Sequence, residues 1–439
     1  MDLLRRAYDG HSSDEEREAV GADLSPAKRH KPQFPKPYYT RSAEVRMPTQ
    51  AAAPIEGFVP GRYVSKRERA MVFSGAANVP SPSPIGEPQA SSPSPSSAVM
   101  GSLSDSSLPS EIISSLRNQS ASRSRRRPPP YQLSVALTGH ERAVTAIRWS
   151  KTHSHLLASA GMDGKVYIWN VWSKDQNASR ILTFHNSAVK DVKWSEIRWS
   201  ILSCGYDCTS RLANVEKGTL TQVFREDQVV NTVSFSPEDS NIFLSGGTNG
   251  SLRLWDVRTG KMVHSYIRKL GPILDLEFSL DGKRFISSSD VSRSNISENS
   301  LVVWDVRREV PLSSQVYAEA YTCPCVRHHP TEPNFVAQSN GNYVALFSSV
   351  PPFRLDKYKR YEGHGVSGFP IKCDFSLDGE ILASGSSEGS LYFYDYRTAQ
   401  LLHRTNAYKS ACVDVAFHPI MSNVIACCSW DGDVSVFRG

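Results

Sequence analysis

The sequence predicts an all-β fold, a seven-bladed β-propeller, preceded by a disordered N-terminal tail over residues 1–130. All eight tryptophans lie between Trp149 and Trp430, whereas 17 of the 27 prolines lie in the predicted tail. From residue 131 onward, an apolar or aromatic residue closes a β-like run after a polar turn seven times, at steps of 42 to 49 residues. A period of this length is typical of four-stranded propeller blades.

The tail differs from the repeats in composition and charge. A serine- and proline-rich segment without tryptophan buries too little apolar surface to offset the entropy that it loses on ordering. Residues 1–130 hold 18 Lys and Arg against 13 Asp and Glu, whereas the remaining residues are balanced at 32 against 31. Because the basic excess lies in the tail, we expect any RNA to be bound through the tail only.

Two basic clusters in the tail are candidate nuclear import signals, and solvated charge runs are the alternative. No apolar run reaches the 18 residues of a membrane span, so we expect an intracellular protein that does not bind membranes. The basic clusters predict a nuclear location, with the cytoplasm as a further location. The candidate import residues are Lys28, Arg29, Lys31, Arg125, Arg126 and Arg127.

Each repeat has the pattern of four short strands, shown best by the first. Alternating apolar residues mark strands at 144–149 and 166–169, and Asp163-Gly164 suits a two-residue hairpin turn because both residues tolerate a positive φ. The sequence given ends directly after the third strand of the seventh repeat. Residues 131–137 are therefore expected to supply the outer strand of that blade and to close a monomeric ring over residues 131–439.

This pattern resembles the WD40-repeat family, in which a His, a Ser or Thr, an Asp and a Trp form a hydrogen-bonded tetrad. The resemblance assigns these roles in blade one to His140, Ser159, Asp163 and Trp169. Blade two has Ala213 where the tryptophan is expected, which predicts a weak point in the ring.

Longer stretches resemble the family of WD repeat-containing protein 25, which is related to the second-step pre-mRNA splicing factor of the WD40 class. These stretches include residues 137–140, 159–163, 337–347 and 427–432. The resemblance implies a nuclear protein–protein interaction scaffold that is associated with pre-mRNA processing and binds components of ribonucleoprotein complexes.

No pattern of catalytic residues predicts an enzyme. Residues 385–389 match Gly-x-Ser-x-Gly, but they lie in a β-hairpin rather than between a strand and a helix. The residues that come nearest to a zinc site are crowded onto one strand and its following turn. We therefore favour buried free cysteines of the sheet core over zinc ligands. We therefore expect no catalysis, metal or cofactor. The four zinc-type residues are Cys323, Cys325, His328 and His329.

Two sets of residues are candidates for partner binding. Side chains just before the turn between the second and third strands usually face the top of a propeller, and here they include Met162, Tyr206 and Trp430. Two Trp-Asp-Val-Arg sequences resemble the W-D-x-R box with which WD40 substrate receptors dock on the adaptor of cullin-RING ubiquitin ligases. Arg258 and Arg307 would be the docking residues. A scaffold and a ubiquitin-ligase substrate receptor are therefore alternative functions.

Overall fold

The structure is a computed structural model, and its described residues are 97–117, 130–291, 300–313 and 321–439. Every described residue belongs to one compact unit of the chain, Ala76–Gly439. The predicted import residues at 28–31 and 125–127 lie outside the described residues. Within the described part, no helix is long and apolar enough to span a membrane.

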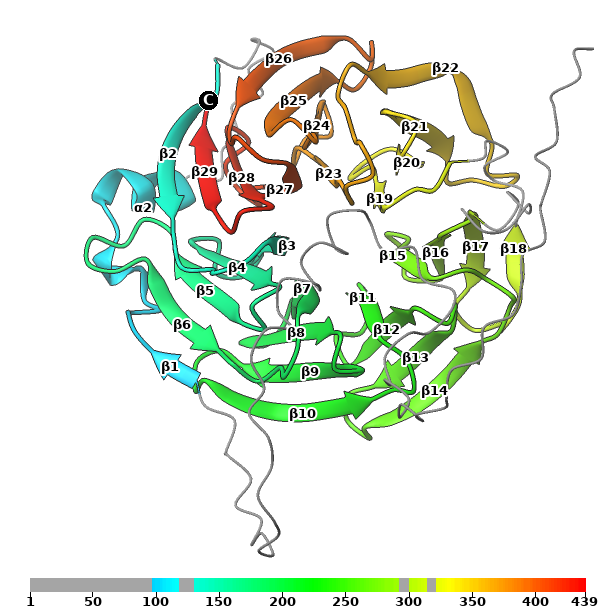
Figure 1. Ribbon diagram of the computed structural model, residues 1–439, viewed down its shortest axis with the longest axis horizontal. Coiled ribbons are helices and arrows are strands. Elements are labelled where there is room, and N and C mark those ends of the chain that lie inside the picture. The colour runs from blue at the N-terminus through cyan, green and yellow to red at the C-terminus, as the bar shows by residue number, and fades with distance from the viewer. Residues whose placement is uncertain (1–96, 118–129, 292–299, 314–320) are drawn as a thin grey trace, which may run out of the picture. The chain divides into compact units, whose positions relative to one another are not determined.

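Seven antiparallel sheets stand around a central axis, and Figure 1 looks down that axis. This arrangement confirms the predicted seven-bladed propeller. The strands nearest the axis, from blade one to blade seven, are β3 (Val144–Trp149), β7 (Val189–Trp194), β11 (Val230–Phe235), β15 (Ile273–Phe278), β19 (Cys325–His328), β23 (Cys373–Phe375) and β27 (Cys412–Phe417).

Each blade continues outward through a second and a third strand. The second strands are β4 (Leu156–Gly161), β8 (Ser200–Gly205), β12 (Ile242–Gly247), β16 (Arg284–Ser289), β20 (Asn334–Ser339), β24 (Ile381–Ser384) and β28 (Val424–Ser429). The third strands are β5 (Val166–Asn170), β9 (Thr209–Asn214), β13 (Leu252–Asp256), β17 (Leu301–Asp305), β21 (Tyr343–Ser348), β25 (Ser390–Asp395) and β29 (Val434–Arg438).

The fourth strand of each blade lies on the outside of the ring. In blades one to six these strands are β6 (Ala178–Leu182), β10 (Thr219–Arg225), β14 (Lys261–Tyr266), β18 (Pro311–Ser313), β22 (Leu355–Glu362) and β26 (Leu401–Asn406). In blade seven the fourth strand is β2 (Gln132–Leu137), which comes from the other end of the propeller sequence.

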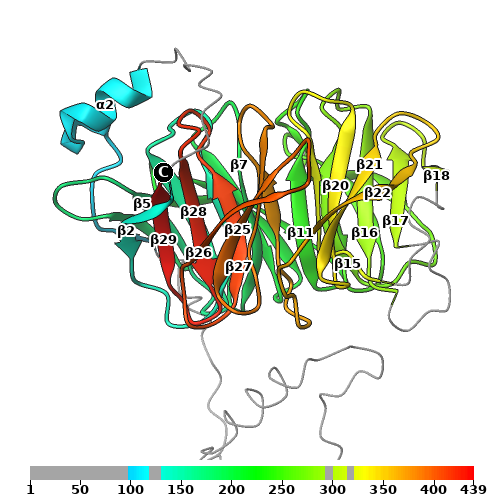
Figure 2. The same cartoon turned by 90° about the horizontal axis from the view of Figure 1, so that it is seen from above.

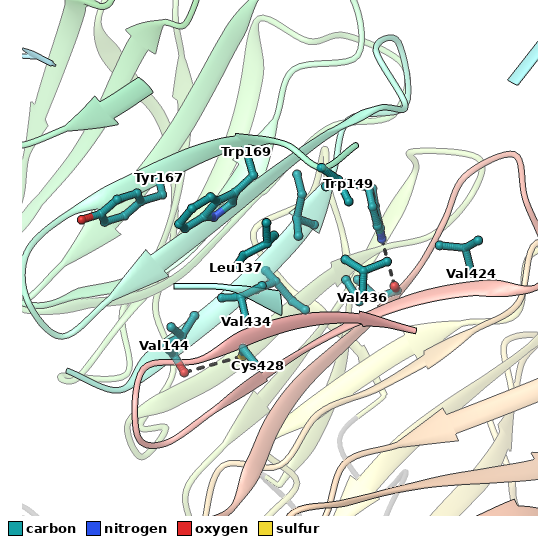
Figure 3. Packing of buried hydrophobic residues seen from close by; sticks show 14 of the residues in the cluster. Leu137, Val144, Trp149, Tyr167, Trp169, Val424, Cys428, Val434 and Val436 are labelled. Carbon is teal, nitrogen blue, oxygen red and sulfur yellow. Dashed lines mark hydrogen bonds between the residues drawn. The ribbon is translucent and has the colours of Figure 1, made fainter. Parts of the chain in front are cut away.

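The ring is closed where β2 pairs antiparallel with β29, with Leu137 opposite Val434. Figure 1 shows β2 beside the C-terminal strands. Leu137, Val434 and Val436 are all buried in one core that also contains Trp169 of blade one, and Figure 3 shows these side chains packed together. Closure therefore joins the first and last parts of the propeller by both main-chain pairing and a shared apolar core.

Residues 97–117 form structure on the ring, within the segment 1–130 that composition predicts to be mostly disordered. They form β1 (Ser97–Val99), the short 3-10 helix η1 (Asp105–Ser107) and α2 (Ser110–Arg117). Leu108 is 3% exposed and Ile112 is 8% exposed. Composition averaged over the whole tail concealed a short stretch with enough aliphatic side chains to pack on the propeller. Figure 2 shows α2 outside the strands of blades one and seven.

Candidate partner-binding face

The turns between second and third strands lie on one face of the ring, which we call the top face. At the start of each turn a backbone N–H donates to a carbonyl in the loop before the first strand of the same blade. Met162 donates to Ala143 at 2.8 Å, and Trp430 donates to Ala411 at 2.9 Å. The equivalent donors in blades two to six are Tyr206, Thr248, Asp290, Asn340 and Ser387.

The three predicted contact residues occupy equivalent positions on consecutive blades. Trp430, Met162 and Tyr206 belong to blades seven, one and two, and each side chain is half-buried. The other four blades have Thr, Asp, Asn or Ser at this position. The aromatic and thioether side chains thus gather on one part of the top face, which we call the top arc (Trp430, Met162 and Tyr206).

The loop before β23 adds an aromatic residue that sequence reasoning missed. The ring of Phe369 packs edge-to-face on Trp430, with 5.4 Å between centroids and 77° between planes. The indole Nε1 of Trp430 is buried there and has no hydrogen-bond partner among the described residues. Ser367 and Gly368 have φ of 47° and 77°, so a turn with left-handed backbone immediately precedes Phe369. The Ser367-Gly368 pair was the only available sequence signal, and it does not identify the partner of Phe369.

A positively charged side chain lies over the ring of Tyr206. The ammonium of Lys190, on β7, lies 5.0 Å from the centroid of the Tyr206 ring. An aromatic face attracts a cation at this distance through its quadrupole. The blade-two end of the top arc is therefore cationic, whereas the blade-seven end is aromatic.

The predicted tetrad of blade one supports this face from below. His140 Nδ1 lies 3.0 Å from an Asp163 carboxylate oxygen, and His140 Nε2 lies 2.8 Å from Ser159 Oγ. Trp169 Nε1 donates to the same hydroxyl at 2.8 Å. Burial raises the pKa of Asp163, but the hydrogen bond and charge interaction with His140, together with the backbone N–H groups of Lys165 and Glu141, outweigh burial and hold that pKa below its usual value. The tetrad fixes the hairpin that carries Met162.

Blade two keeps part of this network without its tryptophan. His185 Nδ1 lies 3.0 Å from Asp207, and Ala213 occupies the tryptophan position. Arg211 stands where blade one has Tyr167. Tyr167 donates to the carbonyl before the tetrad histidine of blade one, and Arg211 donates to the equivalent carbonyl in blade two.

Arg211 adds contacts that a tyrosine cannot make. Its Nη2 donates to Asp207 at 3.0 Å, and its Nε donates to Thr209 Oγ1 at 3.0 Å. The side chains of Arg211 and Asp207 are 11% and 8% exposed, so the ion pair is largely buried. Sequence reasoning missed Arg211 because an arginine two residues before the tryptophan position also fits a solvated strand end.

Charged side chains on the innermost strands are paired between blades. Arg148 Nη1 donates to Asp414 of blade seven at 2.8 Å, and Arg327 Nη1 donates to Asp275 of blade four at 2.7 Å. Burial raises the pKa of both aspartates, but the neighbouring arginine and lysine side chains together hold these pKa values below the usual range. These groups join the blades electrostatically.

The W-D-x-R residues lie at equivalent places on neighbouring blades. Arg258 follows β13 of blade three, and Arg307 follows β17 of blade four. The Arg258 side chain is 61% exposed, and its Nη2 donates to Asp256 of the same box at 3.1 Å. Arg307 is exposed, and its backbone N–H donates to Asp305 at 2.9 Å. Both arginines are accessible to a partner.

The zinc-type residues make other contacts. His329 Nε2 lies 3.0 Å from the carbonyl oxygen of Gly379, and Cys325 Sγ donates to the Cys373 carbonyl at 3.6 Å. In the part of the chain that the structure describes, no group of three or more His, Cys, Asp or Glu residues is arranged to hold a metal ion.

Two sequence profiles match the chain. The profile described as "WD domain, G-beta repeat" matches residues 131–170 and 356–395. The profile described as "Eukaryotic translation initiation factor eIF2A" matches residues 159–320.

Curated proteins are similar to the chain over much of its length. WD repeat-containing protein 25 of Mus musculus is 37% identical over 70% of this chain and 58% of its own length. Pre-mRNA-processing factor 17 of Mus musculus is 31% identical over 68% of this chain and 51% of its own length. Denticleless protein homolog of Danio rerio is 24% identical over 64% of this chain and 49% of its own length. The chain thus spans about half the length of these relatives.

Proposed function

Because this chain belongs to the WD40-repeat proteins and is related to WD repeat-containing protein 25 and pre-mRNA-processing factor 17, we propose that it is a non-enzymatic scaffold of nuclear pre-mRNA processing complexes. The observation that carries this proposal is the 31% identity to a protein named as a pre-mRNA-processing factor. The ring acts as a monomer and binds proteins of ribonucleoprotein complexes. Any contact with RNA comes from the basic residues of the tail.

The top arc is the surface that binds the protein partner. Trp and Tyr dominate the energetics of protein interfaces, and Met adapts to irregular partners. Trp430 is held by Phe369 and Tyr206 lies beside Lys190. Side chains that are already restrained lose little entropy when a partner binds. The cation near Tyr206 favours a partner with an acidic residue at that end.

Affinity purification from nuclear extract tests this function with the full chain. We expect the wild type to recover spliceosomal proteins, and the double variant Tyr206→Ala/Trp430→Ala to lose them. Thr248→Ala is the matched control, because Thr248 has the equivalent place on blade three outside the top arc. Thermal unfolding of each variant separates lost binding from lost folding. Equal recovery by the wild type and a folded double variant would reject the top arc as the contact.

A substrate receptor of a cullin-RING ubiquitin ligase is the second candidate. It is favoured by the exposure of Arg258 and Arg307 at equivalent places on adjacent blades. In the same purification, this function predicts a cullin adaptor that disappears with Arg258→Ala/Arg307→Ala. Arg308→Ala is the matched control, because Arg308 is an exposed neighbour outside the box. Failure of the wild type to recover any adaptor would reject this candidate.

A further inference from the structure

Side chains of blade one bind the main chain of residues 101–104. Every carbonyl from Gly101 to Ser104 lies within hydrogen-bond distance of a side-chain nitrogen or hydroxyl of this blade. The contacts are Arg180 Nη1 to Gly101 at 2.9 Å, Ser179 Oγ to Ser102 at 2.7 Å, His155 Nε2 to Leu103 at 3.0 Å and Asn170 Nδ2 to Ser104 at 3.0 Å. Contacts to carbonyl oxygens recognise an extended chain with little dependence on its side chains.

The same segment extends the sheet of blade one. β1 pairs antiparallel with β6, with Ser97 opposite Leu182 and Val99 opposite Arg180. The other six blades have four strands each among the described residues, and none has a fifth. Without β1, blade one also has four strands, so it is complete without this strand. The segment therefore occupies an edge that a propeller blade does not need to fill.

Apolar anchors hold the rest of the segment. Leu103 packs on the core between blades one and two, and Leu108 is almost fully buried. Leu116 of α2 packs on the core that contains Leu137 and Val434, where the ring closes. Main-chain recognition at one end and separate apolar anchors beyond it are features of a bound peptide.

We propose that residues 97–117 are a peptide ligand bound in cis to a docking site on blade one. The blade-one docking site consists of the outer edge of β6 with His155, Asn170, Ser179 and Arg180. It accepts a serine-rich segment that begins as a strand and whose leucines match Leu103 and Leu108 in spacing. The docking site contains none of the top-arc residues, so this inference is independent of the proposed function.

Peptide exchange in the full chain tests the blade-one docking site. A specific protease site is introduced between residues 118 and 129, and the purified protein is cut there. We expect the N-terminal fragment to co-elute with the ring, and a labelled synthetic peptide of residues 97–117 to replace it saturably. The Leu103→Asp/Leu108→Asp peptide is expected to bind about 100-fold more weakly, since it places charge against apolar contacts. The Ser114→Ala peptide is the matched control, because Ser114 is exposed, and it is expected to bind like the unaltered peptide.

Amino-acid substitutions in the protein provide a second test of the docking site. Arg180→Ala removes the donor to Gly101, and we expect about tenfold weaker peptide binding. In the uncut chain, Leu103→Asp/Leu108→Asp is expected to speed amide hydrogen exchange over residues 97–104 while β27 to β29 keep their protection. A cut protein that releases the fragment and binds no peptide would overturn the proposal. So would a fragment that cannot be exchanged without unfolding the ring, because the segment would then be an integral part of the fold.

Discussion

Replacement of Arg211 by alanine should expose the weak point of blade two. In this blade Ala213 removes the tryptophan that would donate to the tetrad serine, and Arg211 provides contacts to Asp207, Thr209 and the Phe184 carbonyl instead. Arg211→Ala leaves the largely buried Asp207 carboxylate without its guanidinium partner, whereas the contact with His185 Nδ1 at 3.0 Å remains. Removal of one partner from a buried ion pair costs about 3–5 kcal/mol.

The magnitude should fall at the lower end of that range. Asp207 also accepts from the backbone N–H of Thr209 at 3.2 Å and from the Thr209 hydroxyl at 2.7 Å, and both contacts survive the change. We therefore expect Arg211→Ala to lower the free energy of unfolding by about 3 kcal/mol at pH 7. Arg211→Tyr should recover about 1 kcal/mol of this, because a tyrosine at the equivalent place in blade one reaches the carbonyl before the histidine.

Urea unfolding followed by tryptophan fluorescence measures the loss. Arg198→Ala is the matched control on the same blade, because Arg198 is exposed and its guanidinium donates to Asn241 at 3.0 Å. The control should change stability by no more than about 0.5 kcal/mol. The reasoning is refuted if Arg211→Ala is as stable as Arg198→Ala, or if Arg211→Tyr is no more stable than Arg211→Ala.

Three further measurements address the ring as a whole. Burial lowers the pKa of His364 to about 4. The unfolded chain therefore binds a proton at a higher pH than the folded chain does. The free energy of unfolding should fall by up to about 3 kcal/mol as the pH drops from about 6.5 to 4. His364→Gln should flatten that slope in urea titrations at several pH values, and an unchanged slope would contradict the assignment. Asp414→Asn should destabilise the ring by about 3 kcal/mol because it leaves Arg148 buried without its carboxylate, and chemical unfolding that matches the wild type would count against it. Deletion of residues 1–96 should leave the thermal midpoint nearly unchanged, whereas deletion of residues 1–137 removes the closing strand and should lower it most; equal losses in calorimetry would exclude this role for the strand.

The candidate site was only partly predictable from the sequence. The three residues of the top arc follow from their place before each hairpin turn, which is a local feature of every repeat. The contact of Phe369 with Trp430 joins two loops on different blades. No local pattern encodes it, because the path of a long loop depends on the packing of the blades beneath it.

The sequence by itself determined the number of blades, the place of Ala213 in blade two and the segment that supplies the outer strand of blade seven. These features repeat about every 40 residues or follow from a strand count, and strands with alternating apolar residues are local. The tertiary structure decided the rest. It showed that residues 97–117 lie on blade one, that Arg211 takes part in the blade-two network, and that Arg148 pairs with Asp414 across 266 positions of sequence. Such contacts arise only after the ring has closed, because closure brings distant residues together and burial then determines which charges must be paired.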